Sequence, residues 1–426
     1  MISKYEALNL FIFDLEMNQE LILYALLFIV VIILIVCLIA SKRASILHRY
    51  RYKMSSNLMP MHRYLNVNST LAPRTGYYNP SDLGYRNMRI LRNEKEAVFN
   101  EIKRFVNAPA NARVVLVSGA TEAIATCVNW AKHYNRYGDI YGTSFDHSSI
   151  KANAENQELK YKLLDDNITN PSAPNDERRR LSVLFENPSA IFLTHVNSRT
   201  GEILPDEYLN IAKRIKTKLN PEFEDENEVI VLPYKPLVFI DATQSITKIP
   251  IDMSATKANA LFFSMHKIGG PMNLGVLIVN EEDKPFIPLI AGAQNNGMRG
   301  GTMNETEFVE NRDVFKYEPA PDTREESWNK AVKKLEENGV HVEKPKGPHL
   351  YNTIVVEVKS SCPLGVIDKL YAKGICVGTM SACASENDVK NMEGGAISHI
   401  RISFMNADDI DDNVVNVIAD EINNEI

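Results

Sequence analysis

Short and uninterrupted apolar runs recur through the central part of this 426-residue chain. They lie at 191–193, 237–240, 260–263 and 276–279. A strand buried on one face alternates apolar and polar residues, whereas a strand covered on both faces is apolar throughout. Apolar residues at helical spacing between 88 and 106, and again between 123 and 130, supply helices that can cover those faces. The pattern predicts an α/β fold with a mostly parallel sheet.

Two of these runs end in residues that can carry out chemistry. The run 237–240 ends on Asp241, and the next run leads to Lys267 beside His266. Taken alone, a lysine is usually a solvated surface charge, and an acid at a strand end usually caps the next helix. Together they form the pair that pyridoxal 5'-phosphate (PLP) requires. The lysine bonds to the cofactor aldehyde, and the acid keeps the pyridine nitrogen protonated so that the ring can accept electrons.

A third segment has the features of an anion site. The strand predicted at 114–117 breaks at Ser118-Gly119-Ala120-Thr121-Glu122, and helical spacing resumes directly afterwards. A strand, a turn of small residues and a helix present backbone N–H groups and the positive end of the helix dipole to an anion. Alone the motif is a weak signal, because Thr followed by an acid is often only a helix N-cap.

The motif Asp241-Ala242-Thr243-Gln244-Ser245, followed by Ser264-x-His266-Lys267-x-x-Gly270-Pro271, resembles the PLP lysine region of class V aminotransferase-fold enzymes. The resemblance is closest to the cysteine desulfurases of the NifS/IscS type. Further motifs follow in family order: Gly119-Ala120-Thr121-Glu122, Asp146-His147, Asn197-x-x-Thr200-Gly201, Arg299-Gly300-Gly301-Thr302, Ser381-Ala382-Cys383 and Arg401. The resemblance extends from about Tyr64 to Asn413. It implies fold type I of the PLP-dependent transferases, with a large domain and a smaller α+β domain.

The resemblance implies a role for each matching residue. Around the cofactor it implies Ala120, Thr121, Ser264 and His266 at the phosphate, Asp241 at the pyridine nitrogen, Gln244 and Asn197 at the phenolic oxygen, His147 on the ring face and Lys267 at the aldehyde. Thr302 matches a position that reaches the phosphate of a neighbouring subunit, which implies a homodimer. No metal is expected.

Cys383 decides which reaction the resemblance implies. It matches the cysteine whose thiolate takes the sulfur of L-cysteine, so that L-alanine is released and a persulfide forms on Cys383. Such sulfur passes to an acceptor protein for iron–sulfur clusters or other thio-cofactors. The implied catalytic residues are therefore Lys267, Cys383 and His147, and the implied substrate-binding residues are Asn197 and Arg401. A buried, inert thiol is the commoner state of cysteine, but small polar neighbours on both sides predict exposure.

Other interpretations stay open. The stretch from Cys383 to Arg401 is several residues shorter than in the IscS-like group, which limits how far a persulfide could swing. The nearest alternative is another class V reaction, such as that of a selenocysteine lyase or an aminotransferase. The alternative from a different class is a membrane-tethered protein that keeps the PLP fold without turnover.

The N-terminal region differs in composition from the rest. Residues 21–40 carry no charge, which is the length and character of a helix that crosses a bilayer. A buried soluble helix is the alternative, but such a helix seldom runs this long without a polar face. Basic residues follow at Lys42, Arg43 and Arg49, so the positive-inside rule predicts a single-pass membrane protein with its catalytic domain in the cytoplasm. Five cysteines without a CxxC pair fit that reducing compartment.

After about Phe308 the expected elements are a helix near 327–338, a strand at 353–358 and a helix after Asp408. They predict the smaller domain. The expected bounds are a leader at 1–20, a membrane span at 21–40, a basic linker at 41–57, a PLP-binding large domain at 58–307, of which 58–80 could join the small domain, and the small domain at 308–426. The net charge of −7 gives no reason to expect a nucleic-acid partner.

Overall fold

The computed structural model describes most of the chain beyond residue 85. The described parts are 86–164, 187–217, 230–232, 235–281, 284–316, 322–358, 363–379, 398–404 and 406–424. The chain divides into two compact units, 1–53 and 54–426, and every described residue belongs to the second unit.

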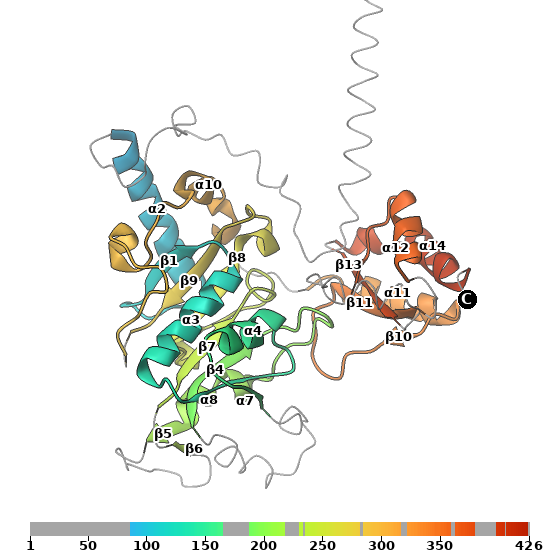
Figure 1. Cartoon of the computed structure of the whole chain (residues 1–426). Helices are drawn as coiled ribbons and strands as arrows, with labels where there is room; N and C mark the ends of the chain where they lie inside the picture. The colour runs from blue at the N-terminus through green and yellow to red at the C-terminus, as the bar shows by residue number, and fades with distance from the viewer. Residues whose placement is uncertain are drawn as a thin grey trace, which may run out of the picture. The chain divides into compact units, whose positions relative to one another are not determined.

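A seven-stranded sheet forms the centre of the larger part, with strand order β1-β9-β8-β7-β4-β2-β3 (Figure 1). Its strands are β1 (Arg113–Val117), β2 (Asp139–Gly142), β3 (Tyr161–Leu163), β4 (Pro188–Thr194), β7 (Leu237–Asp241), β8 (Ala260–Ser264) and β9 (Gly275–Val279). The strands from β8 to β3 run parallel, and β9 runs antiparallel to both β8 and β1. The predicted α/β fold with a mostly parallel sheet is confirmed.

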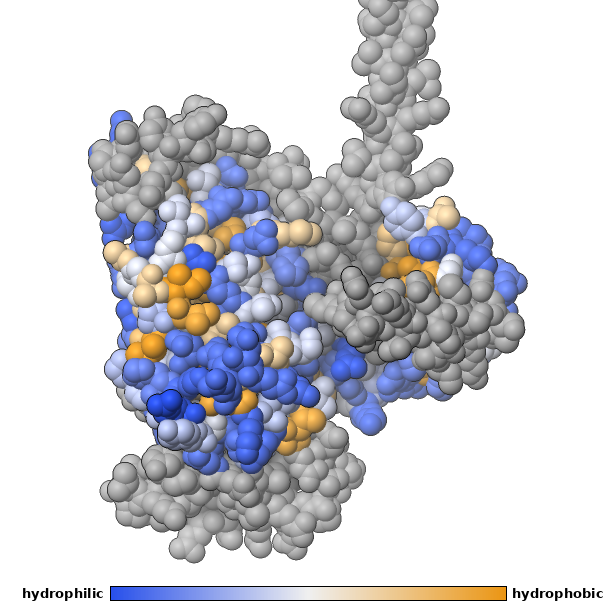
Figure 2. Space-filling view, viewed as in Figure 1, coloured by the Kyte–Doolittle hydropathy of each residue, from blue (hydrophilic) through white to orange (hydrophobic). Residues whose placement is uncertain are grey.

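Helices cover both faces of this sheet, which explains the apolar runs. On one face α3 (Ala120–Tyr134) and α4 (Ser148–Asn156) share a core with Phe262 of β8. On the other, α2 (Arg86–Phe105) and α10 (Glu305–Glu310) share a core with Phe263, the next residue. Both phenylalanines are fully buried, so both faces of the strand are covered, which accounts for its continuous apolar run. On the face in view, hydrophilic residues accordingly cover most of the described surface (Figure 2).

Short helices connect the strands and longer helices of the larger part. They are α7 (Asp206–Leu209), α8 (Ile211–Arg214), α9 (Met253–Thr256), and the 3-10 helices η3 (Met265–Ile268), η4 (Gln294–Gly297) and η5 (Arg312–Lys316). Two further strands, β5 (Ile215–Thr217) and β6 (Ile230–Leu232), pair in parallel as a separate two-stranded sheet.

A four-stranded antiparallel sheet forms the C-terminal part, in the order β10-β11-β13-β12. Its strands are β10 (Val342–Glu343), β11 (Thr353–Val358), β12 (Gly378–Thr379) and β13 (Ser398–Ser403). Beside it lie α11 (Glu325–Glu337), α12 (Pro363–Ala372), the 3-10 helix η6 (Ala407–Ile410) and α14 (Asp412–Asn423) (Figure 1). The helices and strands share one core of buried aliphatic residues and Trp328. The expected domain bounds stay predictions.

The predicted single-pass membrane localisation is corrected. Searching the described residues shows no helix that is both long enough and apolar enough to cross a membrane. The expected span at 21–40 lies outside these residues. The predicted anchor and the topology derived from it are therefore not retained.

Candidate active site

The predicted site residues gather where parallel strands end at one edge of the seven-stranded sheet. Asp241 is the last residue of β7, and it pairs in register with Thr194, the last residue of β4. Ser264 is the last residue of β8, and the 3-10 helix η3 that follows it carries His266 and Lys267. In open α/β sheets, ligands bind outside the carboxyl ends of such strands.

The turn before α3 meets the end of β8 at this edge. The backbone N–H of Ala120 donates to Ser264 Oγ over 2.8 Å, so the two sides of the predicted phosphate cradle are in direct contact. Gly275 on β9 makes the approach possible, because a Cβ there would lie 2.7 Å from the Cα of Gly119. Thr121, next on the helix, is exposed. The structure thus brings Ala120 and Ser264 together, with His266 one residue beyond Met265 on η3.

His147 lies within electrostatic reach of both Asp241 and Lys267. Burial lowers the pKa of His147, the charge of Asp241 raises it and that of Lys267 lowers it further. His147 is the N-cap of α4, where its Nδ1 accepts from the backbone N–H of Ser149 over 3.2 Å. An accepting Nδ1 leaves the ring proton on Nε2. Burial raises the pKa of Asp241, whose charge a cationic partner would stabilise.

Asp146, directly before His147, forms a hydrogen-bonded hub that the sequence did not reveal. Its carboxylate accepts from the backbone N–H and hydroxyl of Thr143 (both 3.1 Å), from Tyr161 OH (3.0 Å) and from Thr194 Oγ1 (2.7 Å). These donors follow β2, begin β3 and end β4. Burial raises the pKa of Asp146 to about 7 despite the four donors. The hub fixes the backbone that presents His147.

Lys248 is a second amine near the site, and the sequence reasoning missed it. Its Nζ donates to the backbone carbonyl of Gln244 over 2.8 Å and lies 3.4 Å from Gln244 Oε1. Burial, followed by the charges of Lys267, Arg324 and Arg401, lowers the pKa of Lys248 to about 7, although its side chain is only half-buried by area. The spacing of four residues after Gln244 was the only available signal. Because the ammonium of Lys248 lies beside Oε1 of Gln244, the amide N–H groups of Gln244 point away from Lys248.

The predicted substrate groups meet where the C-terminal sheet contacts the large sheet's loops. Arg401 on β13 is 3% exposed, and its Nη1 donates to the carbonyl of Ser198 over 2.7 Å. The neighbouring Asn197 uses its Oδ1 to accept from the backbone N–H of Arg199, which leaves Nδ2 as its side-chain donor. Burial lowers the pKa of Arg401. The described residues therefore place both substrate-binding candidates at one turn.

Two predicted residues are not brought into this group. Thr302 is exposed and lies in the segment before α10. Cys383 falls outside the described residues. Of the two cysteines that the structure describes, Cys127 and Cys376, Cys127 is fully buried in α3, and burial followed by the charge of Asp241 raises its pKa well above the usual value. Cys127 is therefore a poor nucleophile.

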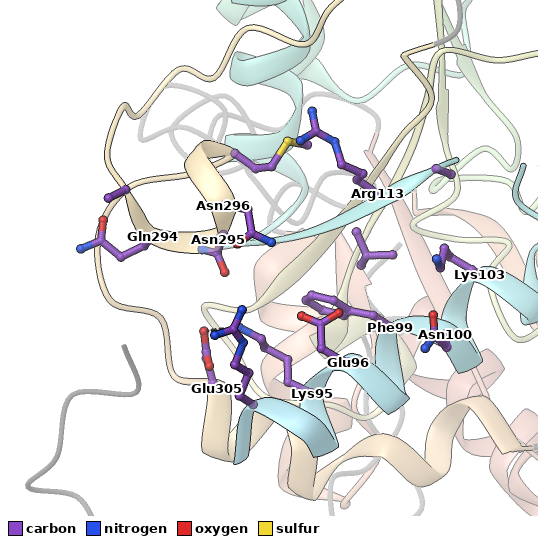
Figure 3. Close-up of a pocket in the computed structure, with 15 residues that line it drawn as sticks. Lys95, Glu96, Phe99, Asn100, Lys103, Arg113, Gln294, Asn295, Asn296 and Glu305 are labelled. Carbon is purple, nitrogen blue, oxygen red and sulfur yellow. Dashed lines mark hydrogen bonds and ion pairs between the residues drawn. The ribbon is translucent and has the colours of Figure 1, made fainter. Parts of the chain in front are cut away.

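A separate pocket of about 460 Å³ lies between α2 and the loop around η4 (Figure 3). None of the predicted site residues lines it. Three of its six charged lining residues are in ion pairs: Lys95 contacts Glu305 at 2.7 Å, and Arg113 pairs with Glu281. The first of these pairs holds the start of α10, which follows Thr302, against α2.

Solved structures share the fold. A NifS-like protein superposes with a TM-score of 0.66 at 20% identity and covers 88% of this chain and 98% of its own. An apo cysteine desulfurase from Thermococcus onnurineus NA1 superposes with a TM-score of 0.63 at 18% identity and covers 85% of this chain and 90% of its own. At these identities the likeness shows the fold alone.

Sequence comparison identifies the family. A cysteine desulfurase IscS of Shewanella baltica strain OS155 is 29% identical over 314 residues, which are 67% of this chain and 68% of that protein. A cysteine desulfurase IscS of Glaesserella parasuis is 27% identical over 213 residues, about half of each chain. The model of the aminotransferase class-V family matches residues 77–219 and 224–414. Because this match covers more than half of the sequence, the chain belongs to the class V aminotransferase family.

Proposed function

We propose that this protein is a PLP-dependent cysteine desulfurase. It converts L-cysteine to L-alanine and retains the sulfur as a persulfide on Cys383, for transfer to an acceptor protein. The observation that carries the proposal is the convergence of Asp241, His147 and Lys267 at one sheet edge beside the Ala120–Ser264 contact. Cysteine desulfurase relatives among the similar proteins support the choice of reaction.

The residues present fit PLP on two grounds. First, three buried polar atoms have no partner among the described residues: His195 Nδ1 and Thr243 Oγ1, just beyond the ends of β4 and β7, and Arg401 Nε on β13. Buried polar atoms normally find partners, so these orphans fit a polar ligand that shares the edge. Second, the donor set matches the cofactor's chemistry, with backbone N–H groups and a helix N-terminus for a phosphate and a buried carboxylate for a pyridine nitrogen.

When bound, PLP would supply an electron sink that stabilises negative charge on the substrate carbon. The chain's own residues would hold it and move protons. Ala120, Thr121, Ser264 and His266 would bind the phosphate, and Asp241 would pair with the pyridine nitrogen. His147 is suited to accept or donate a proton, because burial keeps its pKa below the usual value and its ring neutral. Lys267 would anchor the cofactor.

Substrate orientation would come from the turn that Arg401 shares with Asn197. The Nε of Arg401 is buried without a described partner, and a carboxylate that accepts from a guanidinium in two places satisfies such a donor. Thr302, exposed at the end of its loop, would reach the phosphate of a second copy in a homodimer.

The test compares the absorbance spectrum of the purified protein before and after addition of L-cysteine, with sulfide release measured under reductant. Cys383→Ala is expected to retain the cofactor band and lose sulfide release. Cys376→Ala is the matched control, since Cys376 is a half-buried cysteine outside the proposed chemistry. Unchanged sulfide release from Cys383→Ala would refute the desulfurase mechanism. Selenide release only from selenocysteine, or amino transfer to a keto acid, would identify another class V reaction.

A further inference from the structure

A buried ion pair joins the proposed phosphate turn to the loop that carries Thr302. Arg299 Nε contacts Glu122 Oε1 at 2.8 Å, and Arg299 Nη2 contacts Glu122 Oε2 at 3.1 Å. The two side chains are only 14% and 10% exposed. Glu122 also reaches back one turn, where its Oε2 accepts from the backbone N–H of Ser118 over 2.9 Å. This carboxylate therefore lies at the start of α3, beside Ala120 and Thr121.

The position of Glu122 poses an electrostatic problem for a phosphate site. Burial raises the pKa of Glu122, but hydrogen bonds from Arg299 and Ser118 outweigh burial and hold the pKa below the usual value. The carboxylate is thus ionised at neutral pH, in the first turn of the helix whose N–H groups would bind phosphate. Two like charges in a partly buried site repel, and screening by solvent is weak there. The guanidinium of Arg299, bound in two places, neutralises that charge.

The same arginine fixes one end of the segment that carries Thr302. At the other end, Glu305 begins α10 and pairs with Lys95 of α2 at 2.7 Å, with both side chains 11% exposed (Figure 3). Within the loop, Gly300 N donates to the carbonyl of Ile290 over 2.8 Å, and a Cβ on Gly300 would lie 2.2 Å from the carbonyl oxygen of Ala291. Buried ion pairs therefore hold the exposed Thr302 from both sides.

We propose that Arg299 is a positioning residue for the cofactor phosphate: it neutralises Glu122 at the start of α3 and holds the segment that presents Thr302 to a second copy of the chain. This inference rests on the proposed PLP site. In this proposal Arg299 acts through Glu122 and the loop.

The experiment measures the dissociation constants of PLP and of pyridoxal, which lacks the phosphate, for protein freed of cofactor. Arg299→Met is expected to weaken PLP binding by about tenfold or more, the scale of one lost charge-assisted contact, and pyridoxal binding by less than about threefold. Adding Glu122→Gln to Arg299→Met removes the uncompensated charge and is expected to recover most of the PLP affinity. Inorganic phosphate should compete with PLP less effectively in Arg299→Met than in the unmodified protein.

Lys373→Met is the matched control. It breaks the ion pair with Glu421 of α14, in the C-terminal part and outside the proposed phosphate site, and is expected to lower the melting temperature without changing the ratio of PLP to pyridoxal affinity. If Arg299→Met does not fold, the single variant Glu122→Gln tests the inference. It should bind PLP at least as tightly as the unmodified protein. Equal losses for PLP and pyridoxal, or no recovery in the double variant, would overturn the inference. Unmodified protein that binds no PLP would instead refute the proposed function.

Discussion

The seven-stranded and four-stranded sheets differ in what they bury. At one edge of the seven-stranded sheet, burial shifts the pKa values of Asp146, Asp241 and His266, and these groups lie within a few residues of strand ends. The four-stranded sheet is built around an aliphatic core, and its buried charge is Arg401, which turns toward Ser198 in the other part. Under the proposed function, one sheet would supply the reactive groups and the other a substrate contact. The following predictions test that division.

The largest effect is expected in two of the three hydrophobic cores among the described residues, the one that contains Phe239 and the C-terminal one. Phe239→Ala removes a fully buried ring that packs on Trp130 (5.7 Å between centroids) and Phe192 (5.1 Å), and should cost about 3–5 kcal/mol in the free energy of unfolding. Leu335→Ala in the C-terminal core should cost about 2–5 kcal/mol. Phe239 and Leu335 belong to separate clusters. In urea unfolding, the loss in free energy of unfolding of the double variant should therefore equal the sum of the two single losses within about 0.5 kcal/mol. A large coupling energy would show that the two cores act as one.

Arg401→Met tests whether the C-terminal sheet contributes substrate binding. Loss of a charge-assisted contact worth about 1.5–3 kcal/mol should lower kcat/KM for L-cysteine by roughly 10- to 100-fold. The absorbance of bound cofactor should not change, because the large sheet holds it. Arg401→Lys keeps the charge but not the paired geometry, so its kcat/KM should lie between those of the unmodified protein and Arg401→Met. Loss of the cofactor band in Arg401→Met would contradict the proposal that the large sheet holds the cofactor and the C-terminal sheet contacts only the substrate.

Asp146→Asn tests the hub beside His147. An amide cannot accept from all four donors, so at pH 8 the variant should lose about 1–3 kcal/mol in the free energy of unfolding. In the unmodified protein, the folded chain holds a proton on Asp146 between the ordinary pKa of 3.8 and about 7, where the unfolded chain does not. This group therefore makes stability fall as pH rises through that range, and Asp146→Asn should flatten the fall. Asp412→Asn, at an exposed acid of α14, should leave the pH profile unchanged.

Lys248→Met should have the opposite sign, and its effect should be the smallest because solvent screens this half-buried amine. The pKa of Lys248 is about 7 in the folded chain and 10.5 ordinarily, so between these values the unfolded chain binds a proton that the folded chain lacks. The contribution of Lys248 to the free energy of unfolding therefore increases with pH from about 7 to about 10.5. In Lys248→Met this increase should be absent. Free energies of unfolding at pH 7, 8 and 9 measure it. Lys330→Met, at an exposed lysine of α11, is the control and should keep the slope.

Much of the fold could be predicted because its signals are local. The run at 260–263 and the strand β8 (Ala260–Ser264) differ by one residue, and the strand predicted at 353–358 has the bounds of β11. Apolar periodicity depends only on which faces of an element are covered. The antiparallel direction of β9 and the pairing of β5 with β6 were not predictable in this way, because strand direction and partner depend on the connections between strands.

The class of the fold and the motifs at the strand ends, and hence the kind of chemistry proposed, follow from the sequence alone, since each signal spans a few neighbouring residues. The three-dimensional fold was needed to show that Glu122 binds Arg299, that Lys95 binds Glu305 and that Arg401 reaches Ser198, pairs separated by 177, 210 and 203 positions. Such partners leave no periodic trace. They meet because strand order and helix packing bring distant segments together, and burial then makes each unpaired charge costly enough to require a partner.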